Sequence, residues 1–344
     1  MRVDSPSPLR QSLIVNGTAL RRTSLGGRRY CHGVLQALAW DRPVEISPPP
    51  RWSKLERIDE LLQRGRPDAI FWSPNQRGPI FARNHVVTVL DCINVEYVYR
   101  HDWRLPLYRT LFNSVLDRAI AVVAISNATR DAILRNYRID PAKLHVIAGP
   151  VDFGDDLRHR QSVTHAPDCD PPFVLMITNA LPHKNTARAC AAFAASAAAS
   201  RGIALRVVGM IDTAAEAACR AAGVQVETHS GIDDEALASW MFQCRFLFSP
   251  SLEEGLNLPI AEALSAQVNV LCSDIQVHRE FYDGEVRFFD PLDRDSIVDA
   301  LNRAFDLPGP WEIARSGEAK RSFADVARDY RSIFMRIAAN VRAS

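Results

Sequence analysis

The sequence lacks the features that mark membrane-spanning, secreted and metal-stabilised proteins. No stretch approaches the roughly 18 uninterrupted apolar residues that cross a bilayer, and the opening MRVDSPSPLR contains no apolar core of a secretion signal. The seven cysteines are odd in number and scattered, without the CxxC pair of a zinc or redox site. We therefore expect a cytoplasmic protein with reduced cysteines and no bound metal.

Net charge is also nearly absent, but the charges are distributed unevenly. Residues 1–160 hold 24 Lys/Arg against 16 Asp/Glu, a net of +8, whereas the remainder holds 17 against 24, a net of −7. A basic half favours an anionic surface, and Arg100, Arg104 and Arg109 surround the apolar Trp103. We expect peripheral contact with an anionic membrane at its inner face and no nucleic-acid partner. The alternative is a solvated arginine face around a core-facing Trp103.

The length and the apolar pattern predict two domains of one class. At 344 residues the chain exceeds what a single hydrophobic core usually holds. Short apolar runs alternate with amphipathic segments, which is typical of parallel sheets wound by helices, so the predicted class is α/β with two doubly wound domains. The predicted strands are Leu13–Val15, Ala69–Trp72, Val86–Leu90, Ile120–Ile125, Phe173–Ile177, Leu205–Val208, Val224–Val226, Phe246–Ser249 and Val268–Leu271.

A polar, proline-containing stretch separates the two alternating patterns. We predict an N-terminal domain over 1–151, a linker over 152–172, a C-terminal domain over 173–318 and a closing helix over 319–344. Apolar residues of the last segment form one stripe at helical spacing. Such a stripe must be buried, and the first domain is a surface on which it can pack.

The most informative segment is FSPSLEEGLNLPIAEAL at 248–264, where a buried strand leads into a polar turn and a helix begins near Pro259. Open α/β sheets bind ligands at the carboxyl ends of their strands, and a helix N-terminus favours a phosphate. Glu254 lies in the turn and Glu262 lies in the helix. Carboxylates accept hydrogen bonds from sugar and ribose hydroxyls, although an isolated pair is more often a helix cap and a solvent-facing glutamate.

This segment resembles the EX7E motif of the retaining GT-B glycosyltransferases of family 4, also called group 1. In that family the first glutamate, here Glu254, holds the donor sugar, and the second, here Glu262, holds the nucleotide ribose. The turn ALPHKN at 180–185 resembles the family's lysine-containing element, which implies that Lys184, with His183, balances the donor diphosphate. The stretch SLGGRRYCHGVLQAL at 24–38 resembles the family's first glycine-rich loop and the helix that follows it, with Arg28 or Arg29 near phosphate.

The resemblance continues through VLCSD at 270–274, VHRE at 277–280 and FFDPLD at 288–293, so it covers nearly the whole chain. It implies the GT-B fold, with two Rossmann-like domains facing a cleft and C-terminal helices that cross back to the first domain. We predict catalytic roles for Glu254 and Lys184, donor contacts for Glu262, Gly255, Leu256, Asn257, His183, Asn185, Gly26 and Gly27, and acceptor-side positions at Arg28, Asp91 and Ser126.

Three positions depart from the family pattern. Leu90 stands where many members carry a histidine that touches the donor sugar, and His85 and His101 are not assigned that role. Asn257 replaces a glycine, although asparagine tolerates a left-handed backbone better than most residues. Thr178 replaces the arginine that usually precedes the lysine. These changes affect the donor assignment more than the fold.

The predicted activity is transfer of a hexose such as mannose from a nucleotide sugar to a glycan or lipid-linked acceptor. The family implies retention of configuration, no cofactor, and a role in bacterial surface polysaccharide such as lipopolysaccharide. A nucleotide-sugar epimerase or a phosphorylase of the same plan is one alternative. A non-catalytic sugar-binding or scaffold protein is another, favoured by the missing histidine. NAD chemistry is disfavoured because no GxGxxG follows the first strand.

Overall fold

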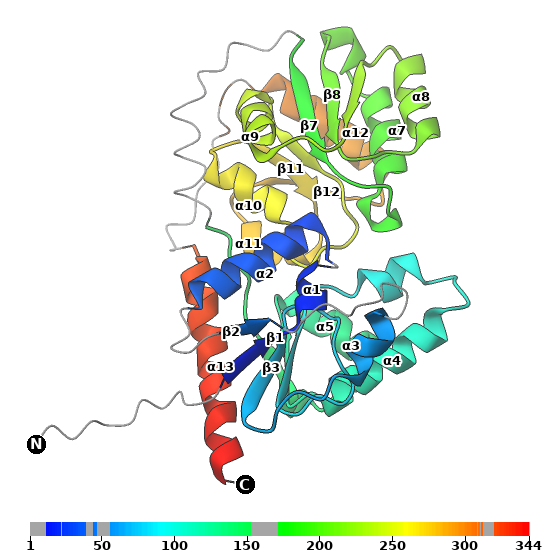
Figure 1. Ribbon diagram of the computed structural model, residues 1–344. Coiled ribbons are helices and arrows are strands. Elements are labelled where there is room, and N and C mark those ends of the chain that lie inside the picture. The colour runs from blue at the N-terminus through cyan, green and yellow to red at the C-terminus, as the bar shows by residue number, and fades with distance from the viewer. Residues whose placement is uncertain are drawn as a thin grey trace, which may run out of the picture. The chain divides into compact units, whose positions relative to one another are not determined.

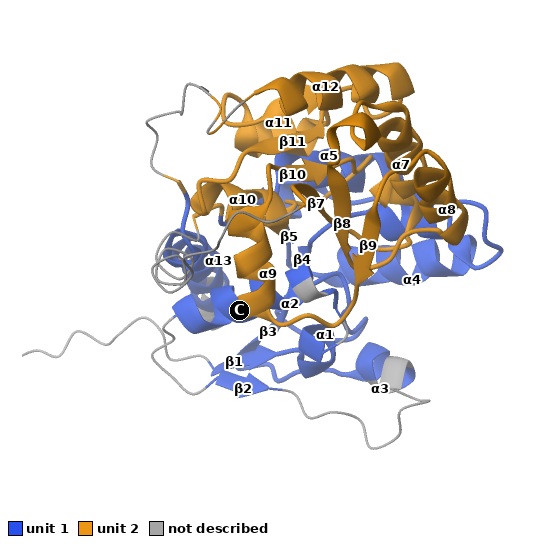
Figure 2. Ribbon diagram, turned by 90° about the horizontal axis from the view of Figure 1, so that it is seen from above, with its two compact units in different colours: residues 1–150, 321–344 blue, residues 151–320 orange. Residues whose placement is uncertain are grey.

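The fold is known from a computed structural model, which describes residues 12–21, 23–38, 44–46, 56–152, 171–307, 309, 311 and 320–343 (Figure 1). The chain divides into two compact units (Figure 2). The first comprises residues 1–150 and 321–344, and the second comprises residues 151–320. Most of the linker predicted at 152–172 lies outside the described residues.

The first unit is built on a parallel sheet of six described strands in the order β2-β1-β3-β4-β5-β6. Its central strands are buried along their whole length, which explains their continuous apolar runs. The elements are β1 (Ser12–Val15), α1 (Gly17–Arg21), α2 (Leu25–Ala37), β2 (Val44–Ile46), α3 (Glu56–Leu62), β3 (Ala69–Ser73), β4 (His85–Val89), the π-helix η1 (Asn94–Val98), α4 (Leu105–Arg118), β5 (Ala121–Ala124), α5 (Asn127–Asn136), η2 (Pro141–Lys143), β6 (Leu144–Val146) and α13 (Phe323–Ala343).

The second unit repeats the plan with a parallel sheet in the order β12-β11-β10-β7-β8-β9. Helices α7, α8 and α12 pack together on one face of it, around Phe193 and Phe305 (Figure 1). The elements are β7 (Phe173–Ile177), η3 (Pro182–Lys184), α7 (Thr186–Ala195), η4 (Ala199–Arg201), β8 (Ala204–Val208), α8 (Thr213–Ala221), β9 (Val226–His229), α9 (Asp234–Gln243), β10 (Leu247–Ser249), α10 (Leu258–Ser265), β11 (Val270–Ser273), α11 (Gln276–Tyr282), β12 (Arg287–Phe289) and α12 (Arg294–Asp306).

The second sheet changes direction between β7 and β10. From β7 the chain proceeds outward through β8 and β9, and from β10 it proceeds the opposite way through β11 and β12. Loops that leave the carboxyl ends of two such strands diverge and open a crevice, which is where ligands bind in open α/β sheets. The predicted α/β class with two doubly wound domains is therefore confirmed, and the topology marks one place for a ligand in this unit.

The closing helix α13 belongs to the first unit, as predicted, and runs beside α2 (Figure 1). Its Tyr330 is fully buried, and the phenol oxygen lies 2.8 Å from Thr88 Oγ1 on β4 and 3.2 Å from Tyr30 Oη on α2. Trp72 Nε1 on β3 donates to the same Thr88 oxygen at 3.1 Å. A buried polar network thus joins the last helix to the centre of the first sheet.

Three strands escaped prediction, namely β2, β6 and β12. Each is a short strand at the edge of its sheet, and each is at least partly exposed along most of its length. An edge strand with a solvated face carries no continuous apolar run, so the pattern that revealed the central strands is missing. Among the helices in the described part of the chain, none is both long and apolar enough to span a membrane.

Candidate functional site

The loops after β7 and β10 bring together the two residues predicted to be catalytic. Lys184 ends the short η3 turn after β7, and Glu254 lies in the loop after β10. Lys184 Nζ donates to Glu254 Oε1 at 2.5 Å, and the two side chains are 16% and 10% exposed. The pair lies at the topological switch point of the second sheet, the place where open α/β sheets bind ligands.

Asn185 fixes the loop that carries Lys184. Its backbone is left-handed, with φ of 55°, a conformation that asparagine adopts more readily than other non-glycine residues. Its Nδ2 donates to the carbonyl of Pro250 at 3.2 Å and to that of Pro291 at 2.9 Å. Arg188 in turn donates to Asn185 Oδ1 at 2.8 Å. Asn185 therefore joins the loops after β7, β10 and β12, and its contact with the donor stays a prediction.

The two carboxylate oxygens of Glu254 differ in their hydrogen bonds. Its Oε1 accepts hydrogen bonds from Lys184 and from Ser251 Oγ, the latter at 2.7 Å, whereas Oε2 accepts none from any residue that the structure describes. Burial opposes ionisation of this carboxyl, but the charge of Lys184 and the hydrogen bonds from Lys184 and Ser251 outweigh burial, so its pKa lies below the ordinary value. Glu254 is an oriented carboxylate with an acceptor position to spare.

His183 is a buried neutral residue and not a second cation. Its side chain is 4% exposed. Burial lowers its pKa to about 4; nearby Glu254 raises the pKa and Lys184 lowers it, without cancelling the effect of burial. Its backbone carbonyl accepts from the N–H of Leu252 at 2.7 Å, which joins the loops after β7 and β10. The ring is therefore neutral at neutral pH, and the part predicted for His183 in balancing a diphosphate stays a prediction.

Asn257 has the left-handed backbone that explains a glycine at this position in the family motif. Its φ and ψ are both 63°, and it is the N-cap of α10, yet its side chain does not bond the first N–H groups of that helix. Gly255 and Leu256 precede it in the buried part of the loop. Glu262 lies one turn inside α10, as predicted, and is buried there, unlike the solvent-facing glutamate of the alternative. The N-terminus of α10, which has no side-chain cap, therefore lies between Glu254 and Glu262 in the sequence.

The side chain of Asn257 is anchored by residues that the sequence pattern did not single out. Its Nδ2 donates to Ser249 Oγ and to His278 Nε2, both at 2.9 Å. His278 Nδ1 lies 2.8 Å from the Ser273 carbonyl, which can only accept, so Nδ1 carries the proton and Nε2 is the acceptor. Burial, as the largest effect, lowers the pKa of His278 to about 4, so the neutral tautomer persists.

Tyr282 completes this support from α11. Its hydroxyl donates to the carbonyl of Leu256 at 2.8 Å and lies 3.2 Å from that of Asn257. Ser251, His278 and Tyr282 were missed because a lone serine, histidine or tyrosine carries no periodic signal. Ser251 stands in the block FSPSLEE and His278 in VHRE, so the family matches did point to these segments without indicating which side chain acts.

Three of the predicted residues of the first unit, Gly26, Gly27 and Arg28, lie in the first turn of α2 and not in a loop. A Cβ on Gly27 would stand 2.2 Å from Thr23 Oγ1 and 3.1 Å from Leu90 Cδ1, so the residue at the missing-histidine position packs against the start of α2. Gly26 is exposed, and Arg28 is exposed and donates to the carbonyl of Arg21 at 3.2 Å. This arrangement leaves no space for a side chain at position 27.

The remaining predicted residues of this unit serve local structure. Asp91 Oδ1 accepts from the N–H of Ile93 at 3.1 Å. Ser126 is fully buried and caps α5, with its Oγ accepting from the N–H of Thr129 at 3.0 Å. His85 is buried beside Ser73 Oγ, at 2.9 Å, whereas His101 is exposed. The acceptor-side roles of Asp91 and Ser126 stay predictions.

Trp103 is 85% exposed, so the alternative of a core-facing tryptophan is wrong.

No group of three or more His, Cys, Asp or Glu side chains with the arrangement of a metal site occurs among residues that the structure describes.

Comparison with known proteins identifies the family. A family model described as glycosyl transferases group 1 matches residues 158–322, and one described as glycosyltransferase family 4 matches residues 19–154. The MMP alpha-(1->4)-mannosyltransferase of Mycolicibacterium hassiacum is 27% identical over 256 residues. That match covers 70% of this chain and 59% of the relative, so the chain spans about three fifths of that relative's length.

Solved structures show the same fold at low identity. WaaG, a glycosyltransferase involved in lipopolysaccharide biosynthesis, superposes with a TM-score of 0.59 at 15% identity and covers 96% of this chain and 98% of its own. An alpha,alpha-trehalose 6-phosphate synthase from Burkholderia multivorans gives a TM-score of 0.63 at 13% identity, covering 97% and 100%. With two parallel doubly wound units and both halves matched by models of one family, the chain belongs to the group 1, family 4 glycosyltransferases and has the GT-B fold.

Proposed function

We propose that this protein transfers a hexose from a nucleotide-sugar donor to an acceptor and binds the donor on its second unit. The observation that carries the proposal is the Glu254–Lys184 pair at the switch point between β7 and β10. Glu254 keeps Oε2 open to a hydroxyl donor, and Lys184 Nζ has N–H bonds beyond the one that it gives to Glu254. One acceptor and one cation side by side suit a sugar joined to a diphosphate.

The chemistry assigns a part to each element of the site. When the nucleoside diphosphate leaves, negative charge gathers on its phosphate oxygens. The ammonium group of Lys184 and the uncapped N-terminus of α10 would stabilise that charge. Glu254 and Glu262 would accept hydrogen bonds from the sugar and the ribose. Because Lys184 and the helix N-terminus supply positive charge, we propose that the reaction proceeds without a metal ion.

The finer assignments rest on the relatives. The curated relative is named a mannosyltransferase, so mannose is the sugar that we propose, transferred with retention to a glycan or lipid-linked acceptor. The similarity to WaaG supports a role in bacterial surface polysaccharide. Lys184 as the charge partner of a leaving diphosphate is equally consistent with GDP, UDP and dTDP.

A donor screen tests the proposal. The full chain is incubated with GDP-mannose and with UDP- and dTDP-linked hexoses, and release of the nucleoside diphosphate is followed, since many transferases hydrolyse their donor slowly without acceptor. We expect release from one donor class, with an α-configured sugar product in its proton NMR spectrum. Interconversion of the nucleotide sugars without release would indicate an epimerase, and inertness toward every donor would indicate a binding protein.

A second part of the proposal concerns the membrane. Trp103 and Leu107 are 85% and 58% exposed at the start of α4, and Arg100, Arg104 and Arg109 lie in the same stretch. An exposed tryptophan amid arginines suits the interface of an anionic leaflet, where each basic side chain contributes about 1 kcal/mol at low salt. We propose that this stretch rests on the membrane that holds a lipid-linked acceptor.

Sedimentation with vesicles tests this contact. Binding to phosphatidylglycerol vesicles should exceed binding to phosphatidylcholine vesicles and should fall as salt shortens the range of the charges. The double variant Trp103→Ser, Leu107→Ser should lose most of the binding. Equal partitioning to both vesicles, or wild-type binding by the variant, would remove this part of the proposal and leave the donor site unaffected.

A further inference from the structure

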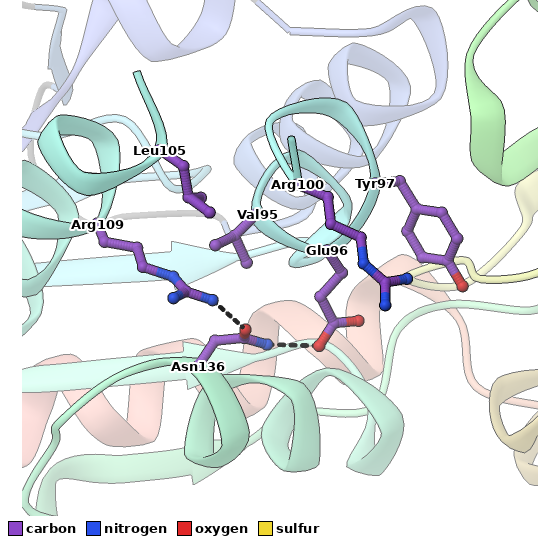
Figure 3. A pocket seen from close by; sticks show the side chains of 7 residues that line it. All are labelled: Val95, Glu96, Tyr97, Arg100, Leu105, Arg109 and Asn136. Atoms are coloured by element: carbon purple, nitrogen blue, oxygen red, sulfur yellow. Dashed lines mark hydrogen bonds between the residues drawn. The ribbon is translucent and has the colours of Figure 1, made fainter. Parts of the chain in front are cut away.

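The first unit contains a pocket that the sugar-transfer chemistry does not use. It has a volume of about 450 Å³, within the range of small-molecule sites. The π-helix η1 and the start of α4 supply most of its wall, and α5 supplies one residue from its last turn. The lining residues are Val95, Glu96, Tyr97, Arg100, Leu105, Arg109 and Asn136 (Figure 3).

The backbone of η1 is itself unusual. Runs of π-helix are rare and occur often at functional sites, since the wider turn costs stability without a local benefit. In η1 the turn points Val95 into the protein, at 2% exposure, and leaves Glu96 and Tyr97 half-buried at the pocket. Three consecutive residues thereby contribute one apolar and two polar side chains to a single wall.

The acidic group of the pocket is already neutralised. Asn136 Nδ2 donates to Glu96 Oε1, and Arg135 pairs with the same oxygen at 3.2 Å. Figure 3 shows Glu96 and Asn136 in a row with Arg109 at one end and Arg100 at the other. The carboxylate therefore does not cancel the charge of the two lining arginines.

The two lining arginines retain most of their hydrogen-bonding capacity. Arg109 Nη2 makes a single long bond of 3.4 Å, to Asn136 Oδ1. Within the described part of the chain, the Arg100 guanidinium forms neither an ion pair nor a hydrogen bond. A guanidinium carries five N–H donors in a planar fork that matches two oxygens of one phosphate. The pocket thus offers two such forks above an apolar floor of Val95 and Leu105.

We propose that this pocket binds a phosphate ester, with Arg100 and Arg109 on the phosphoryl oxygens and the attached carbon chain or ring against Val95 and Leu105. The inference is independent of sugar transfer, because it concerns binding to the first unit alone. Two sources share this chemistry, a soluble phosphorylated metabolite and the headgroup of a phospholipid, and the experiment separates them.

Binding of sn-glycerol 3-phosphate to the full chain is measured by calorimetry at low salt. The double variant Arg100→Gln, Arg109→Gln should weaken binding by at least about tenfold. The matched control Arg118→Gln, Arg138→Gln removes the same charge from exposed positions of the same unit and should change affinity less than about twofold.

The source of the phosphate follows from competition. Phosphatidylglycerol vesicles that displace glycerol 3-phosphate from the wild type would identify a lipid headgroup, and displacement by glucose 6-phosphate alone would identify a soluble ester. Trp103→Ser, Leu107→Ser should retain glycerol 3-phosphate binding even where it loses vesicles. Equal loss in the two double-arginine variants, or wild-type affinity in Arg100→Gln, Arg109→Gln, would overturn the proposal.

Discussion

Asn257 Nδ2 donates to His278 Nε2 across 2.9 Å, so the residue that replaces a family glycine is held in its left-handed conformation by a histidine 21 residues away. The His278 ring is oriented in turn by the Ser273 carbonyl. The loss of glycine at this site is therefore compensated by a side chain that has gained partners. The loop between Glu254 and α10 is therefore held by His278 and Tyr282 of α11 as well as by its own backbone.

Replacing Asn257 should separate the two contributions. Asn257→Ala loses the bonds to Ser249 and His278 and must also place an alanine at φ of 63°, whereas Asn257→Gly loses only the bonds. We expect both to destabilise, and alanine to cost about 1 kcal/mol more than glycine, the usual penalty of a left-handed non-glycine residue. Urea unfolding of the two variants measures the difference. Equal stability of both variants and the wild type would show that neither contribution matters.

Glu254 should be indispensable for turnover. Glu254→Gln keeps the shape but removes the charge that Lys184 pairs with, and we expect the rate of donor turnover to fall by about 10²-fold or more with little change in the unfolding midpoint. Lys184→Met should have a comparable effect. The adjacent Glu253→Gln is the matched control and should turn over near the wild-type rate. A Glu254→Gln enzyme as fast as the wild type would rule out the assigned role.

Chelation should leave the reaction unchanged. If Lys184 and the N-terminus of α10 carry the charge of the leaving diphosphate, no divalent ion is needed, and donor turnover in EDTA should match turnover in Mg²⁺. The measurement is the initial rate after exhaustive chelation. Loss of activity that Mg²⁺ or Mn²⁺ restores would assign the counter-charge to a metal and would reduce Lys184 to a positioning role.

Sequence patterns predicted the buried central strands and missed strands at the partly exposed edges of the sheets. The central strands of both sheets carry apolar runs because helices cover both faces, and these were predicted nearly residue by residue. The strand predicted at Val224–Val226 instead spans Val226–His229, and it lies at a sheet edge, like the three strands that were missed. Where solvent replaces a packed face, the alternation that reveals a strand disappears.

The sequence predicted those site residues that belong to a family motif. Glu254 and Lys184 come from loops 70 residues apart, and only the family pattern linked them before the structure showed their contact. The supporting residues Ser251, His278 and Tyr282 act through single hydrogen bonds to loop backbone or to one side chain. Such partners depend on tertiary packing, which no local spacing records, and the same holds for the neutral state of His183.

As the pH is lowered, the free energy of unfolding should begin to fall at a higher pH than protonation of carboxylates alone would cause. Burial lowers the pKa of His85 to about 3 and, as the largest effect, lowers those of His183 and His278 to about 4. Unfolded histidine titrates near 6.5, so between pH 6.5 and 4 the unfolded chain binds protons that the folded chain does not. Stability therefore rises with pH in this window and levels off above it.

The slope is measurable by urea unfolding at pH 7.5, 6.0 and 5.0. Each buried histidine contributes up to about 1.4 kcal/mol per pH unit within the window. His278→Gln should reduce the slope, and the exposed His101→Gln should not. An unfolding free energy that is constant from pH 7.5 to 5.0 would contradict the neutral, buried state of these rings.

The last prediction concerns the attachment of α13 to the first unit. Tyr330 and Thr88 meet at 2.8 Å, with Tyr30 and Trp72 bonded to the same pair of oxygens. Tyr330→Phe keeps the ring in place but leaves the Tyr30 and Thr88 hydroxyls without this partner, and should cost about 1–3 kcal/mol. Tyr330→Ala also opens a cavity beside Trp72, and should cost about 3–5 kcal/mol.

A double-mutant cycle distinguishes a network from separate contacts. Thr88→Val removes the other hydroxyl with little change of shape, so if the two oxygens stabilise each other, the combined Tyr330→Phe, Thr88→Val variant should lose less than the sum of the single losses, with a coupling of about 0.5–3 kcal/mol. Unfolding free energies of the four proteins measure it. Strict additivity would show that the Tyr330 and Thr88 hydroxyls contribute independently and do not form one network, because then neither would depend on the other for its contribution.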